Sequence, residues 1–342
     1  MAPFITNPYR FAEAEEVGGW VELGRTTLGS ASDTITVSSL ADKRYYMVLW
    51  NIIPTGNVFH EARLNGDTGL NYASRFSTNG GGDGTGTSQP ILSNGVAGGS
   101  TPAFHVGYWA NYSSKEKLGI THSVGQSTAG ASTVPIRREI VGKHAQTLNP
   151  INEFQAYNSN TGDYGTGSEV VVLGWDPADT HTNNFWEELA SVNASGSSTN
   201  LSSGTITAKK YLWVQCYSEG TGGDIFTAFN NDNGPNYARR FSLDGGADST
   251  SGSIPSISNM HNSGRAGEEA FSNWFIINNA SNEKLCIGHS IQQAGTGATF
   301  APRRNEFVAK WANTSNQITE IDFDSVSGNF GTNSILKVWG AD

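Results

Sequence analysis

The chain has 342 residues, and its 21 basic and 31 acidic residues give a formal net charge of −10. This acidic balance argues against nucleic acid and against anionic membranes as partners, because both attract clusters of Lys and Arg. No run approaches the roughly 18 apolar residues of a membrane-spanning helix, and the two cysteines, Cys216 and Cys286, show no metal-ligand spacing.

The first segment, residues 1–19, contains Pro3, Pro8 and several aromatic residues. It has no basic region followed by an apolar core, so we do not predict a secretory signal peptide. The segment has no counterpart elsewhere in the chain. Two alternatives stay open for it: an extended arm that lies on a neighbouring subunit, or a frayed terminus.

From Trp20 onward the chain repeats itself once. Residues 65–77, NGDTGLNYASRFS, return as residues 230–242, NNDNGPNYARRFS, and at nearly the same step Trp20 matches Trp186. A repeat of this length is typical of a duplicated domain, whereas a solenoid repeats over about 20–50 residues. We therefore predict two domains, residues 20–176 and residues 177–342.

Strand patterns dominate both halves. In residues 304–311 polar and apolar side chains alternate, as on a half-buried strand. Residues 45–53 and 274–277 are continuously apolar, which is typical of strands covered on both faces or lying at a domain contact. Glycine is frequent, with 41 residues, and long helical patterns are absent. The sequence therefore predicts an all-β fold of two tandem antiparallel β-sandwiches, jelly-roll-like, with about 8–10 strands each.

The sharpest local motif is Asn-x-Asp-x-Gly-x-Asn-Tyr, which occurs in each half. Oxygen-bearing side chains at alternate positions around a glycine resemble a calcium-binding loop. An alternative, which we favour, is a turn held by Asx hydrogen bonds with Tyr72 or Tyr237 packed beneath it. Calcium is the only candidate cofactor, and its candidate ligands are Asn65, Asp67, Asn71, Asn230, Asp232 and Asn236.

No catalytic constellation stands out. His122 and His289 occupy matched positions, but no nucleophile motif accompanies them, so we interpret them as structural and predict that the chain is not an enzyme. Loop aromatics form a second candidate site: Trp109, Tyr112 and Trp274 are candidate contacts for a glycan or host surface. The commoner fate of Trp is core or interface packing.

The Asn-x-Asp-x-Gly-x-Asn-Tyr turns, the Asn-Gly-Gly loop and the final strand ending in Gly340 resemble repeat modules of structural proteins from tailed viruses. The resemblance covers both halves but not the N-terminal segment. It implies a non-enzymatic β-sandwich component of a virus particle that assembles with copies of itself.

These observations predict a virion surface protein, either a capsid decoration or a tail or fibre component, that stabilises the particle or contacts the host. The expected partners are other copies of the chain, with a trimer favoured, other virion proteins and a host surface glycan. The expected location is the virion, after synthesis in the host cytoplasm. Two alternatives remain: a lectin-like carbohydrate-binding module and a double-barrel major capsid protein.

Overall fold

The computed structural model describes residues 19–342 except 94, 96–98, 181, 182, 221, 222 and 261–267. The predicted N-terminal arm, up to residue 18, therefore lies outside the described residues. Within the described part the chain forms 24 β-strands and no helix, which confirms the all-β prediction. The same residues accordingly hold no helix of the length and apolarity needed to cross a membrane.

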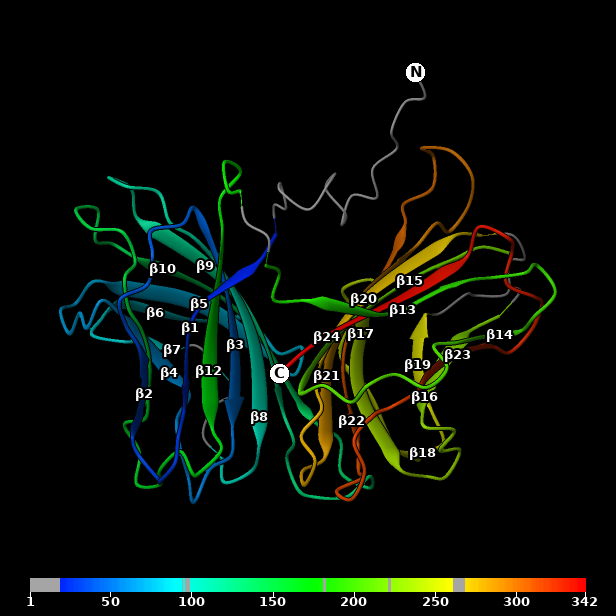
Figure 1. Cartoon of the computed structure of the whole chain (residues 1–342), viewed down its shortest axis with the longest axis horizontal. Coiled ribbons are helices and arrows are strands. Elements are labelled where there is room, and N and C mark those ends of the chain that lie inside the picture. The colour runs from blue at the N-terminus through cyan, green and yellow to red at the C-terminus, as the bar shows by residue number, and fades with distance from the viewer. Residues whose placement is uncertain (1–18, 94, 96–98, 181–182, 221–222, 261–267) are drawn as a thin grey trace.

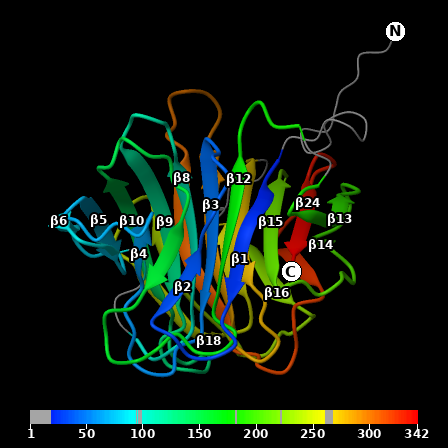
Figure 2. The same ribbon diagram turned by 60° about the vertical axis from the view of Figure 1, so that its left-hand side comes forward.

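Two antiparallel sheets form the first half (Figure 1). Its strands are β1 (Val21–Thr27), β2 (Thr34–Val37), β3 (Tyr45–Ile52), β4 (Glu61–Leu64), β5 (Tyr72–Thr78), β6 (Gly84–Gln89), β7 (Leu92–Ser93), β8 (Ala103–Ala110), β9 (Lys117–Gly125), β10 (Ile136–His144), β11 (Phe154–Tyr157) and β12 (Glu169–Trp175). The larger sheet has the order β1-β12-β3-β8-β9-β10-β5-β6, and the smaller sheet has the order β2-β11-β4-β7. Figure 2 shows the strands β8, β3, β12 and β1 side by side.

The second half repeats this plan. Its strands are β13 (Glu187–Asn193), β14 (Asn200–Ser202), β15 (Tyr211–Ser218), β16 (Ile225–Phe229), β17 (Tyr237–Leu243), β18 (Ser249–Ile254), β19 (Ile257–Met260), β20 (Ala270–Ile277), β21 (Lys284–Gln292), β22 (Arg303–Trp311), β23 (Ile321–Ser325) and β24 (Ile335–Ala341). The orders are β13-β24-β15-β20-β21-β22-β17-β18 and β14-β23-β16-β19, strand for strand those of the first half. The arrangement fits a duplicated domain, and its jelly-roll-like character stays a prediction.

Each half has its own hydrophobic core between its two sheets. The first core contains Trp50 and Phe154, and the second contains Trp274 and Phe323. The matched tryptophans Trp20 and Trp186 lie in similar surroundings, since Trp20 is 6.4 Å from the Tyr108 ring and Trp186 is 6.2 Å from the ring of Phe275, the matched residue. Trp20 and Trp186 thus keep equivalent positions in the two halves, although both pack on the outer faces of the larger sheets and not in the two cores.

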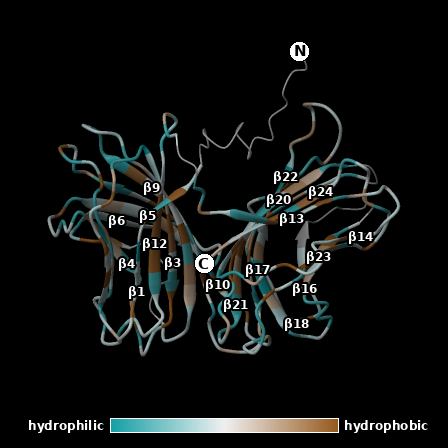
Figure 3. Ribbon diagram, viewed as in Figure 1, coloured by the Kyte–Doolittle hydropathy of each residue, from teal (hydrophilic) through white to brown (hydrophobic). Residues whose placement is uncertain are grey.

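A third apolar cluster joins the two halves. It is formed by the outer faces of the two eight-stranded sheets, where Leu49 and Phe104 of the first half meet Phe275 and Ile287 of the second. Strands β3 and β12 are therefore buried on both faces, and for β3 the continuous apolar run of residues 45–53 predicts this. Their hydrophobic residues are visible in the middle of the first half in Figure 3.

Candidate functional site

The two predicted calcium loops are held by internal hydrogen bonds. The Asp67 carboxylate accepts hydrogen bonds from the Gly69 backbone N–H (2.8 Å), from Asn71 Nδ2 (2.8 Å) and from His144 Nε2 (2.7 Å). Beneath the turn, the Tyr72 hydroxyl donates to the Asp67 carbonyl at 3.1 Å. This geometry is an Asx turn packed over a tyrosine.

The second loop is built in the same way. Asp232 accepts from the Gly234 N–H at 2.9 Å and from Asn236 Nδ2 at 2.9 Å, and Trp311 Nε1 replaces the histidine of the first loop as a donor at 2.7 Å. Although burial opposes ionisation, the hydrogen bonds from Trp311, Gly234 and Asn236 outweigh it and lower the pKa of Asp232 from 3.8.

The first asparagine of each motif has a different task. Asn65 Oδ1 accepts from the backbone N–H groups of Asn152 and Glu153, and Asn65 Nδ2 donates to the carbonyl of Pro150. Asn230 makes the equivalent bonds with the loop at 317–320. The structure thus brings together Asp67 with Asn71 and Asp232 with Asn236, but it turns Asn65 and Asn230 toward another loop. Calcium binding stays a prediction.

Replacing Asp232 with alanine is expected to lower the free energy of unfolding by about 1–3 kcal/mol, because the buried Trp311 N–H would lose its acceptor. The loss depends on pH. Since the folded pKa of Asp232 lies below 3.8, its contribution is present above about pH 4 and disappears as the pH falls through the folded pKa. Urea unfolding of both proteins at neutral pH and near pH 2 checks this. A difference that persists unchanged in acid would contradict it.

The three aromatic residues predicted to contact a glycan, Trp109, Tyr112 and Trp274, do not form one surface. Trp109 and Trp274 are buried, each in the core of its own half. The prediction that they are exposed was wrong, because on β8 and β20 both side chains point toward the small sheet. Tyr112 is exposed, and the Arg44 guanidinium lies over its ring at 5.1 Å.

The structure instead contains an apolar groove that sequence reasoning missed. It has a volume of about 830 Å³ and lies on the outer face of the first half's larger sheet. The walls are aromatic and aliphatic, and two basic residues, Arg75 and Lys143, also line it. The apolar and aromatic side chains that line the groove include Trp20, Tyr45, Tyr108, Leu118, Ile120, Val141 and Trp175.

Three aliphatic residues of this groove are exposed, although their duplicates are buried. Leu118 is 57% exposed and Leu285 1%; Ile120 is 50% exposed and Ile287 3%. Val141 is 49% exposed, whereas its duplicate, Val308, is 1% exposed.

The first half itself covers these duplicates. Leu285, Ile287 and Val308 belong to the cluster that joins the two halves, together with Phe104 and Val124. The same surface is therefore covered in one domain and open in the other. Alternation of apolar residues along β9 was the available signal, but it could not show which copy is covered.

Comparisons with known proteins do not identify the chain. No family model matches it, and no curated protein matches it. Among solved structures, Ail, the attachment invasion locus protein of Yersinia pestis, has 6% identity and a TM-score of 0.14 over 79% of this chain and 99% of its own. Neisserial surface protein A has 8% identity and a TM-score of 0.11 over 83% and 99%. An acyl-CoA hydrolase from Agrobacterium tumefaciens has 7% identity and a TM-score of 0.15 over 73% and 82%. Scores this low carry no argument about this chain.

Proposed function

We propose that this chain is a structural protein of a virus particle, placed on its surface as a capsid decoration or a tail or fibre component, and that it works as a homo-oligomer. The main support for a homo-oligomer is the apolar groove around Leu118, Ile120 and Val141. Contiguous exposed apolar surface marks protein contacts. The duplicates Leu285 and Ile287 support this proposal, because the equivalent surface of the second half is covered by the first half of the same chain.

The occupant that we propose is the N-terminal segment, residues 1–18, of a second copy. This segment joins the described chain beside Trp20, which lines the groove. The segment carries apolar side chains at Phe4, Ile5, Tyr9 and Phe11, which suit an apolar groove.

Charge and length agree with this choice. Glu13, Glu15 and Glu16 complement the basic residues Arg75 and Lys143 of the groove. An extended chain spans about 3.3 Å per residue, so this segment reaches about 60 Å. That length exceeds one groove and allows the segment to cross to a neighbouring copy, in the manner of an exchanged arm.

The strand order also suits this class of protein. With β5, β6, β9 and β10 set aside, the chain alternates between two four-stranded groups, β1-β12-β3-β8 and β2-β11-β4-β7, except that β4 and β7 both lie in the second group. We take this alternation as the jelly-roll unit, with the hairpin β9–β10 and the pair β5–β6 as additions that widen one sheet. Tandem units of this kind, together with the resemblance of the Asn-x-Asp-x-Gly-x-Asn-Tyr turns, support a particle component.

Deletion of residues 1–18 is expected to convert an oligomer into a monomer of about 36.5 kDa less the deleted segment. Light scattering after size exclusion measures this. The double variant Leu118→Glu/Ile120→Glu is expected to dissociate in the same way, because it places two charges in the groove. Leu148→Glu, an exposed position outside the groove, is the matched control and should stay oligomeric.

Either of two results would contradict the proposed assembly. The first is a full-length chain that is a monomer at micromolar concentration, and the second is a truncated chain that keeps the mass of the oligomer. The virion role is tested separately by peptide mass spectrometry of purified particles. Absence of the chain from intact particles would remove that role and leave the assembly standing.

One observation favours carbohydrate binding as a second candidate function. Tyr45 and Trp175 stack at 5.4 Å between ring centroids within the groove, and Trp20 lies 6.5 Å from Trp175. Aromatic faces of this kind stack on sugar rings. Binding on a glycan array that is lost in Trp175→Ala would favour this candidate, and a flat array would remove it.

A further inference from the structure

Two matched histidine–glutamate pairs face each other where the domains meet. On β9 and β10, His122 lies directly opposite Glu139 in the strand register. On β21 and β22, the duplicates His289 and Glu306 are paired in the same way. The packing of the two sheets brings the two histidine rings to 4.6 Å between centroids, at 68°.

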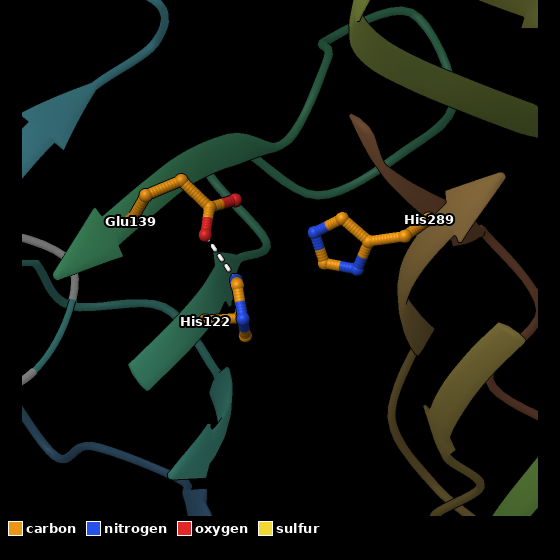
Figure 4. Close-up of side chains that lie close together, drawn as sticks. All are labelled: His122, Glu139 and His289. Carbon is orange, nitrogen blue, oxygen red and sulfur yellow. Dashed lines mark hydrogen bonds and ion pairs between the residues drawn. The ribbon is translucent and has the colours of Figure 1, made fainter. Parts of the chain in front are cut away.

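Three of these side chains converge on one point (Figure 4). His122 Nδ1 donates a hydrogen bond to Glu139 Oε2. One ligand atom each from His122, Glu139 and His289 lies within 4.8 Å of the other two. In the part of the chain that the structure describes, the His289 side chain makes no hydrogen bond, so the unprotonated nitrogen of its neutral imidazole keeps a free lone pair beside the other two ligands.

Glu306, the duplicate of Glu139, pairs with two arginines. Arg137 Nη1 lies 3.2 Å from Glu306 Oε2, and Arg304 Nε lies 3.4 Å from Glu306 Oε1. Arg137 Nη1 also lies 3.4 Å from Glu139 Oε1, so the two glutamates share this arginine, but Glu139 Oε2 accepts the hydrogen bond from His122. In the described part of the chain, the residues that could hold an ion here are therefore His122, Glu139 and His289.

We propose that His122, Glu139 and His289 bind one divalent transition-metal ion that ties the two domains together. Two imidazoles and one carboxylate are a ligand set that zinc accepts, with a fourth position left to water. Zinc binding releases the Nδ1 proton of His122 to water, because the ion takes the place of the hydrogen bond between His122 and Glu139. Two ligands come from the first domain and one from the second, so the ion joins the two larger sheets across the contact between their outer faces.

Zinc added to the metal-free full chain tests this. We expect one zinc per chain after dialysis, and a rise of a few degrees in the melting temperature that a chelator reverses. Cobalt in place of zinc should give the visible absorption of a four-coordinate site. His289→Gln should lose the bound ion, the melting shift and the cobalt spectrum.

Controls keep the result interpretable. Glu116→Gln changes an exposed glutamate that pairs with Lys143 outside the cluster, and it should bind zinc like the parent chain. Melting of His289→Gln in chelator reports whether the variant folds; if it does not, Glu139→Gln is measured instead. Zinc stoichiometry and cobalt spectra that survive in a folded His289→Gln or Glu139→Gln variant would overturn the proposal, as would a parent chain that retains no zinc.

Discussion

Replacing Glu283 with alanine is expected to lower the free energy of unfolding by about 3–5 kcal/mol. The same change at its duplicate, Glu116, is expected to cost only about 0–1 kcal/mol. The two sites carry the same pair of residues, since Lys310 accompanies Glu283 and Lys143 accompanies Glu116. Chemical denaturation of the two variants in parallel measures the contrast.

Burial is the reason for the difference. Lys310 Nζ lies 3.3 Å from Glu283 Oε2 with both side chains buried, and it also donates to the carbonyls of Gln126 (3.1 Å) and Thr128 (2.6 Å) of the other domain. Glu283 in turn accepts from the Gly130 N–H across the same contact. Removing Glu283 leaves a buried ammonium without its counter-ion, and burial already lowers the pKa of Lys310.

The exposed duplicate is a matched control. Lys143 and Glu116 form a 3.0 Å ion pair at the surface, where water screens both charges. Equal losses in the two variants would mean that the Glu283–Lys310 pair is as solvated as the surface pair, which would contradict the packed domain contact. A Lys310→Met/Glu283→Leu double variant should recover much of the loss, since it removes both charges.

Replacing Ile287 with alanine is expected to cost about 2–5 kcal/mol, because it opens a cavity between the domains. Ile287 is buried in the cluster that joins Leu49 and Phe104 to the second half. Ile120→Ala removes the same atoms from the duplicate position, which is half exposed in the isolated chain. There we expect a change within about 0.5 kcal/mol in the unassembled protein.

The two variants distinguish the contact between the domains from the contact between copies of the chain. Thermal melting of dilute, unassembled protein measures the contact between the domains. The concentration dependence of the oligomer measures the contact between copies. Ile120→Ala should weaken self-association while leaving the unassembled protein nearly unchanged. An Ile120→Ala variant that is as unstable as Ile287→Ala would show that the groove is filled within a single chain.

Much of the fold could be predicted from repetition and strand periodicity. The return of the 65–77 motif at 230–242 predicted two copies, and the strand order repeats accordingly. The number of strands was underestimated, at 8–10 against twelve among the described residues of each half. Short strands such as β7 and β14, with two and three residues, carry too little alternation to be recognised.

The candidate sites were harder to predict, because they depend on how the two copies meet. Leu118 and Leu285 have the same sequence context, yet only the second is covered. His122 and His289 were recognised as matched but not as neighbours, since no sequence pattern indicates which faces of two domains touch. Trp109 was expected in an exposed loop, whereas it lies within β8 and faces the core.

The assembled state of the full-length chain tests the account most directly, and electron cryomicroscopy of the purified oligomer or of intact particles would show it. The account predicts density from residues 1–18 of one copy lying over Leu118, Ile120 and Val141 of the next. A groove that stays open in the assembly, or one that is filled by the arm of its own chain, would contradict it.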